Sequence, residues 1–97
     1  MNRVFKALSD PTRRRILQLL RRREMTAGEI ALRFELAKPT LSGHFAILRD
    51  ADLVASDKVG ATITYRLNLS VLEDALLGFA EGFGIGAKAP SKMEEEG

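Results

Sequence analysis

The segment Thr26–Leu48 carries side chains suited to contact with nucleic acid: it reads TAGEIALRFELAKPTLSGHFAIL. Two helical patterns flank a tight break at 35–37, and the second helix opens with small and polar residues that include Thr40, Ser42 and Gly43. Hydroxyl groups can hydrogen-bond base edges or phosphates, and a glycine allows close approach to a groove. The pattern predicts a helix-turn-helix whose second helix enters the major groove of DNA.

His44 is the only histidine, and the chain has no cysteine. Transition-metal sites use several histidine, cysteine or carboxylate ligands, so we expect no metal site and no cofactor. We interpret His44 as a contact to a DNA base or phosphate. Basic residues near it and on a following hairpin would hold phosphates. The predicted DNA-binding residues are Lys38, Thr40, Ser42, Gly43, His44, Arg49, Lys58, Thr62 and Arg66.

Some of the arginines allow a second interpretation. Arg49 stands near the end of its helix, where a cation also complements the helix dipole. Arg13, Arg14 and Arg15 cannot all face one way, and we expect at least one to pair internally with an acidic residue such as Asp10 or Asp50.

No pattern in the sequence indicates an enzyme. The chain has no glycine-rich phosphate loop, and no serine has a histidine base in a recognised arrangement. The carboxylates are scattered over surfaces predicted to be exposed. We therefore expect no catalytic residues.

The composition is that of one small globular domain. The chain has 97 residues, 45% of them hydrophobic, and a net charge of +2. Residues 1–24 hold eight basic side chains, whereas 94–96 are three glutamates. A polyanion partner fits this distribution, and so does a solvated basic face. The chain has no membrane-spanning apolar run and no signal-peptide pattern, so we expect a cytoplasmic protein without membrane contact.

The fold class expected is mainly α (α+β): a winged helix-turn-helix of five helices and a two-stranded hairpin, in the order ααααββα. Helices are predicted over 2–8, 11–22, from Thr26, and over 38–51, strands over 53–57 and 62–67, and a last helix from Ser70. Thr26 and Ser70 each precede a glutamate by three residues, as in capping boxes. We expect residues 1–86 to form the domain and 87–97 a disordered tail.

The apolar residues of two helices predict what each helix packs against. Leu41, Phe45 and Leu48 recur at i, i+4 and i+7, so they form the buried face of the predicted DNA-reading helix. The last helix is apolar over more than one stripe. A second copy of the same helix is the simplest additional partner, which predicts a symmetric dimer.

Four segments in order resemble the ArsR-type winged-helix repressors, from Val4 to about Phe83. They are ALSDPTRRRILQLL, MTAGEIALRF, KPTLSGHFAILRDADLV and KVGATITYRLN. The motif SDPTR, the pair Ser42 and His44, and a wing with Gly60, Tyr65 and Leu67 carry the resemblance. Within the family, the chain is most similar to the metal-independent autorepressor branch, typified by the repressor of a sporulation-delaying protein.

The resemblance implies a homodimeric repressor that pairs through its first and last helices, binds an inverted repeat in a promoter and blocks transcription. The implied dimer interface comprises Val4, Phe5, Leu72, Leu76, Phe79 and Phe83. The chain departs from the metal-sensing members, which carry a Cys-x-Cys in the third helix or acidic–histidine pairs in the last. Two alternatives remain: a repressor that responds to an unidentified small molecule, and a protein-interaction module that no longer binds DNA.

Overall fold

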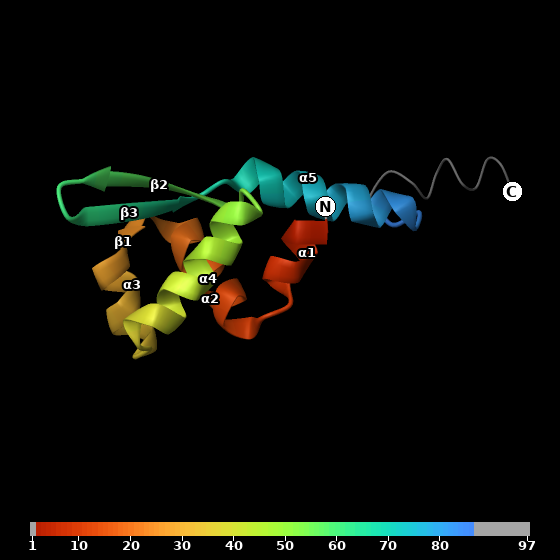
Figure 1. Cartoon of the computed structure of the whole chain (residues 1–97). Helices are drawn as coiled ribbons and strands as arrows, with labels where there is room; N and C mark the ends of the chain where they lie inside the picture. Colours follow the sequence, from red (N-terminus) through yellow and green to blue (C-terminus); the bar gives the residue numbers. More distant parts are fainter. Residues whose placement is uncertain (1, 87–97) are drawn as a thin grey trace, which may run out of the picture.

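A computed structural model describes residues 2–86 of the protein (Figure 1). The elements are α1 (Asn2–Leu8), α2 (Pro11–Arg22), β1 (Met25–Thr26), α3 (Ala27–Phe34), α4 (Lys38–Asp50), β2 (Val54–Val59), β3 (Thr62–Leu67) and α5 (Leu69–Gly82). The structure confirms the winged helix-turn-helix with five helices and a hairpin. The segment 87–97, expected to be a disordered tail, lies outside the described residues.

The short strand β1 was not predicted. It pairs antiparallel with β3, so the sheet has three strands in the order β1-β3-β2. Met25 lies opposite Tyr65, and Thr26 lies opposite Thr64. The strand places the start of α3 against the hairpin, so the wing is joined to the helical body by backbone hydrogen bonds as well as by side chains.

Helix α4 is fixed by the apolar face that its periodicity predicts. Leu41, Phe45 and Leu48 are all buried. The ring of Phe45 stacks on that of Tyr65 in β3, with centroids 3.9 Å apart and planes 8° from parallel. These contacts hold one side of the helix in the core and leave the other side facing solvent.

The hairpin is longer than predicted. The sequence suggested a strand over 53–57 and a four-residue connection, but β2 runs to Val59 and only Gly60 and Ala61 connect the strands. Gly60 has a φ of +62°, as a tight two-residue hairpin turn requires at its first position. Lys58 and Val59, which were predicted to belong to the connection, are part of the ladder and pair with Ile63 and Thr62.

The predicted starts of the helices have different outcomes. The capping box of α3 is present: the Thr26 hydroxyl accepts from Glu29 N at 3.1 Å, and Glu29 accepts from Thr26 N at 2.8 Å. The capping box at Ser70 was wrong. The helix α5 already begins at Leu69, with Asn68 at its cap position, so Ser70 lies inside the first turn. Asn68 instead donates its side-chain N–H to Asp52 O at 2.9 Å.

The hairpin and α5 extend from opposite sides of the helical body (Figure 1). Helix α1 lies beside α5, and the rings of Phe5 and Phe79 connect the two helices with centroids 5.0 Å apart. Helix α4 lies between the wing and α1. This arrangement leaves one side of the N-terminal half of α4, which precedes Phe45, at the surface.

The two helix starts of the helix-turn-helix predict opposite effects of capping substitutions. Ala37, the N-cap residue of α4, supplies no side-chain hydrogen bond, whereas Thr26 does so for α3. We expect Ala37→Ser to raise the free energy of unfolding by about 1 kcal/mol, and Thr26→Ala to lower it by about the same amount. Urea denaturation at one fixed protein concentration measures both. Changes of equal sign in the two variants would contradict the capping argument.

Candidate nucleic-acid interface

The N-terminal half of α4 presents a polar, open surface. Lys38, Thr40, Ser42 and Gly43 are all exposed. A Cβ built on Gly43 would meet no atom within 4 Å, so nothing in the described protein covers this part of the helix. A binding partner could therefore approach the backbone of α4 closely at Gly43.

The polar residues of α4 occupy both flanks of its exposed face. At about 100° per residue, Ser42 and His44 lie about 200° apart measured around the exposed side of the helix, with Gly43 midway between them. Arg49 shares the flank of Lys38 and lies about 16 Å farther along the axis. The residues predicted to contact bases thus cluster at one end of the helix, and Arg49 stands at the other end.

His44 is half-buried and contacts a buried arginine. Its Nδ1 lies 3.2 Å from Arg13 Nη1. The remaining guanidinium nitrogens of Arg13 donate to backbone carbonyls near the end of α1: Nε to Ala7 O at 2.8 Å and Nη2 to Lys6 O at 3.1 Å. Arg13 is only 9% exposed, so its charge is held inside the protein by these acceptors.

One arginine of the 13–15 triplet does anchor internally, but not to an acidic side chain. The guanidinium of Arg13 uses carbonyl oxygens and His44, because the last carbonyls of a helix lack partners within it and attract cations. Asp10 accepts instead from the backbone N–H of Arg13 at 3.0 Å. That hydrogen bond is the main reason why the pKa of Asp10 is lowered. Asp50 forms an exposed ion pair with Arg3, with 3.7 Å between Nε and Oδ2.

The wing carries the other three predicted contacts. Lys58 and Thr62 are exposed near the tip of the hairpin, beside the turn. Arg66 forms an ion pair with Asp57 on the neighbouring strand, and both side chains are about half exposed. Exposed pairs of this kind contribute only about 0–1 kcal/mol, so a phosphate can compete with Asp57 for the guanidinium. Lys58 is thus the more available cation of the wing.

A hollow between α2 and α3 is lined by three arginines that the sequence analysis did not place close together. Its volume is about 310 Å³, and its lining includes Arg15, Arg22 and Arg33. The guanidinium of Arg15 lies over the ring of Phe34, 5.0 Å from its centroid. Because these residues belong to two helices, their proximity had no signal in the periodicity of either one.

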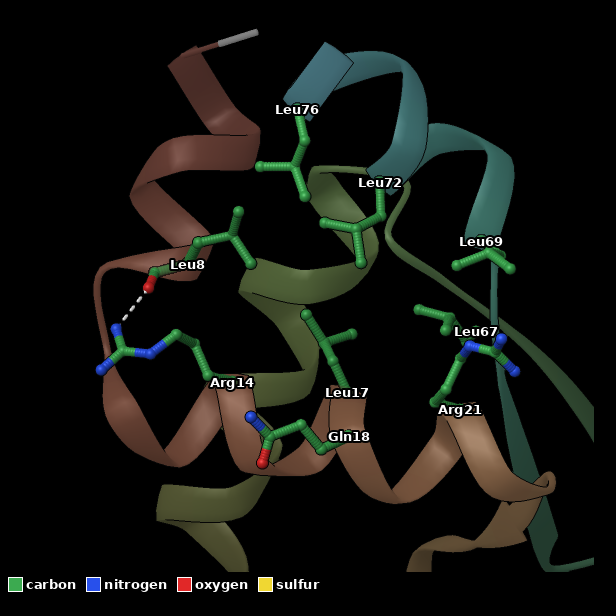
Figure 2. Close-up of a pocket in the computed structure, with 9 residues that line it drawn as sticks. All are labelled: Leu8, Arg14, Leu17, Gln18, Arg21, Leu67, Leu69, Leu72 and Leu76. Atoms are coloured by element: carbon green, nitrogen blue, oxygen red, sulfur yellow. Dashed lines mark hydrogen bonds between the residues drawn. The ribbon is translucent and has the colours of Figure 1, made fainter. Parts of the chain in front are cut away.

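An apolar groove of about 460 Å³ lies between the helical body and the start of α5 (Figure 2). Six leucines from α1, α2, β3 and α5 point toward a common space. Arg14, Gln18 and Arg21 complete the lining, and Arg14 Nη1 donates to Leu8 O at 2.6 Å. The lining leucines are Leu8, Leu17, Leu67, Leu69, Leu72 and Leu76.

The outer surface of α5 exposes a strip of large apolar side chains. Leu76, Phe79 and Phe83 are 45%, 50% and 70% exposed. The Phe79 ring lies between those of Phe5 and Phe83, with centroids 5.0 and 5.1 Å away. We call Phe5, Leu76, Phe79 and Phe83 the aromatic strip. Val4, which was predicted to belong to a dimer interface, is only 6% exposed and is part of the hydrophobic core.

Within residues 2–86, no group of three or more histidine, cysteine, aspartate or glutamate side chains is arranged to hold a metal ion. No helix in this part of the chain has the length and hydropathy needed to cross a bilayer.

Comparison with known proteins gives consistent matches. The family model described as bacterial regulatory protein, arsR family, matches residues 10–56. The transcriptional repressor SdpR of Bacillus subtilis is 50% identical over 78% of this chain and 84% of its own length. The arsenical resistance operon repressor of Staphylococcus aureus is 37% identical over 78% of this chain and 73% of its own. A crystal structure of an ArsR family transcriptional regulator superposes with a TM-score of 0.78 at 32% identity, covering 84% of this chain and 89% of that one.

Proposed function

The chain belongs to the ArsR family of DNA-binding transcriptional repressors, and on that premise we propose that it acts as a homodimer on an inverted-repeat operator without a metal sensor site. The observation that carries the proposal is the exposed polar end of α4, held from behind by Leu41, Phe45 and Leu48. A helix supported in this way can enter the major groove without losing core contacts.

Two groups of residues have different roles in this proposal. Thr40, Ser42, Gly43 and His44 read base edges, because they lie at the exposed end of the helix. Lys38, Arg49, Lys58, Thr62 and Arg66 hold phosphates on either side of the groove. The absence of cysteine and the single histidine support a repressor whose DNA binding does not depend on a transition metal.

The assignment of base contacts predicts the behaviour of the double variant Ser42→Ala/His44→Ala. We expect its affinity for an operator selected from random DNA to fall to that for unrelated sequence, because each good base contact contributes about 1–3 kcal/mol. Gel-shift titration measures the affinity, and circular dichroism checks the fold. Ser70→Ala, an exposed serine on α5, is the matched control. Operator affinity close to wild type in the double variant would refute the assignment.

The wing is expected to contribute one phosphate contact through Lys58. Replacing it with glutamine should weaken binding to all sequences alike and reduce the slope of log affinity against log salt by about one unit. Lys6→Gln, which removes an exposed lysine from α1, is the control and should leave the slope unchanged. If the Lys58→Gln slope equals that of wild type, the wing tip does not contact phosphate.

The aromatic strip supports the dimer in this proposal. The rings of Phe5, Phe79 and Phe83 are partly exposed and lie side by side along α1 and the end of α5. Leu76 of α5 is also exposed and lines the leucine groove. Burial of such apolar surface against another protein surface is favourable, because it removes the apolar area from water. A second copy related by a two-fold axis would pair the strip with itself and place two α4 helices on one side of the assembly.

Phe79→Glu should dissociate the dimer, because a carboxylate would be placed within an apolar interface. Sedimentation equilibrium should then give the mass of a monomer at concentrations where wild type is dimeric, with unchanged helical content. Operator affinity should fall with it, since the two half-sites would no longer be bound together. Ser70→Glu adds the same charge elsewhere on α5 and should remain dimeric. A dimeric Phe79→Glu protein would exclude the strip as the interface.

A further inference from the structure

We propose that Arg13 is a positioning residue for His44: its guanidinium selects the neutral imidazole tautomer with the proton on Nε2, so that α4 presents one fixed N–H donor to DNA. The inference rests on the proposed role of His44 in reading bases. It concerns a contact within the protein, however, so it is tested separately from that role.

The tautomer follows from the chemistry of the two groups. A guanidinium has only N–H donors and does not lose its proton in proteins. Arg13 Nη1 lies 3.2 Å from His44 Nδ1, so Nδ1 must be the acceptor and carry no hydrogen. In a neutral imidazole the proton is then on Nε2. Protonation of both nitrogens would bring an N–H of His44 against an N–H of Arg13.

The Nε2 atom is accessible to a ligand. Among the described residues, no buried side-chain nitrogen or oxygen lacks a hydrogen-bond partner. The only hydrogen bond formed by His44 in this part of the chain uses Nδ1. Nε2 is therefore in contact with solvent, on the side of the ring opposite Arg13. In the proposal, a DNA acceptor takes the place of this solvent.

Arg13 is itself held firmly enough to impose this geometry. Two of its three guanidinium nitrogens are committed to Ala7 O and Lys6 O, and its backbone N–H is committed to Asp10. The side chain is 9% exposed, so water does not compete strongly for it. The third nitrogen, Nη1, is consequently held facing His44 on α4. Besides Arg13, the charged group beside this site is Asp10, whose pKa is lowered mainly by the hydrogen bond from the Arg13 backbone N–H.

A fixed N–H donor restricts which bases His44 accepts. It can donate to guanine N7 or O6, adenine N7 or thymine O4 in the major groove, whereas cytosine presents a donor and is rejected. A neutral ring neutralises no phosphate, so His44 should contribute to sequence discrimination and not to the salt dependence of binding. Loss of Arg13 should likewise reduce sequence discrimination and leave the salt dependence unchanged, although Arg13 itself does not contact DNA in this proposal.

The DNA-free protein gives the first test. Because His44 is the only histidine, nitrogen-15 NMR of the imidazole yields one pair of ring signals. We expect wild type to show a single tautomer with hydrogen on Nε2, and Arg13→Gln, whose amide can donate or accept, to show both tautomers. Arg14→Gln, a change at the exposed neighbouring arginine, should match wild type. An unaltered tautomer in a folded Arg13 variant would overturn the proposal.

Variants of His44 give a second test that does not require Arg13 to be removed. Asparagine can place an acceptor near Nδ1 but reaches no farther, whereas glutamine can place an N–H near Nε2 without the contact to Arg13. We expect His44→Asn to lose about tenfold in the ratio of operator to non-specific affinity, and His44→Gln to lose less. Equal losses in both variants would overturn the proposal.

The combination of variants separates positioning from general stability. Arg13→Gln should reduce the specificity ratio about tenfold in the His44 protein and have little further effect in the His44→Gln protein, with the salt slope unchanged in both. Equal reductions in both backgrounds would show that Arg13 acts on the fold alone and would overturn the proposal. If wild type selects no DNA sequence at all, the proposed function fails, while the tautomer measurement still decides the contact between Arg13 and His44.

Discussion

The stack of Phe45 on Tyr65 connects α4 to the wing, and the arrangement of the candidate nucleic-acid interface depends on it. Both side chains are buried, and Tyr65 lies in β3, the central strand of the sheet. An aromatic pair contributes about 0.5–1.5 kcal/mol beyond the burial of its area. More important here is its geometry: it joins α4 to the strand that carries Thr62 and Arg66, so the residues proposed to read bases and those proposed to hold phosphates keep one relative position.

Much of the fold could be predicted because its signals are local. Asp10 and Pro11 mark the start of α2, and the alternation of Ile63, Tyr65 and Leu67 gives the bounds of β3 correctly. The strand β1 gave no such signal, since two residues show no periodicity and pairing with residues 64 and 65 depends on the tertiary fold. The error at Ser70 has a similar origin: a suitable capping pair was present, but the cap position is Asn68, two residues earlier and directly after the end of β3.

The exposed face of α4 was predictable for the same reason. Burial of Leu41, Phe45 and Leu48 follows from helical periodicity, and it determines which residues of α4 remain exposed. Side-chain partners across the fold do not follow from it. Arg13 and His44 are 31 residues apart, and Arg66 meets Asp57 only because the hairpin register brings them together. Nothing in the local pattern distinguished Arg13 from its two neighbours, although burial gives it a different role.

Helix α5, which is proposed to form the dimer, and helix α4, which is proposed to read bases, are joined by a short and well-defined set of hydrogen bonds. After α4, Leu53 N–H donates to Leu48 O at 3.0 Å, and Asn68 N–H donates to Leu53 O at 2.9 Å at the start of α5. The Asn68 side chain adds its hydrogen bond to Asp52 O. Helix α5 is thus tied at its first turn to the end of α4. If two copies pair through α5, this connection leaves little freedom in the separation of the two reading helices, so the half-site spacing of the operator is a property of the protomer fold and of the aromatic strip together.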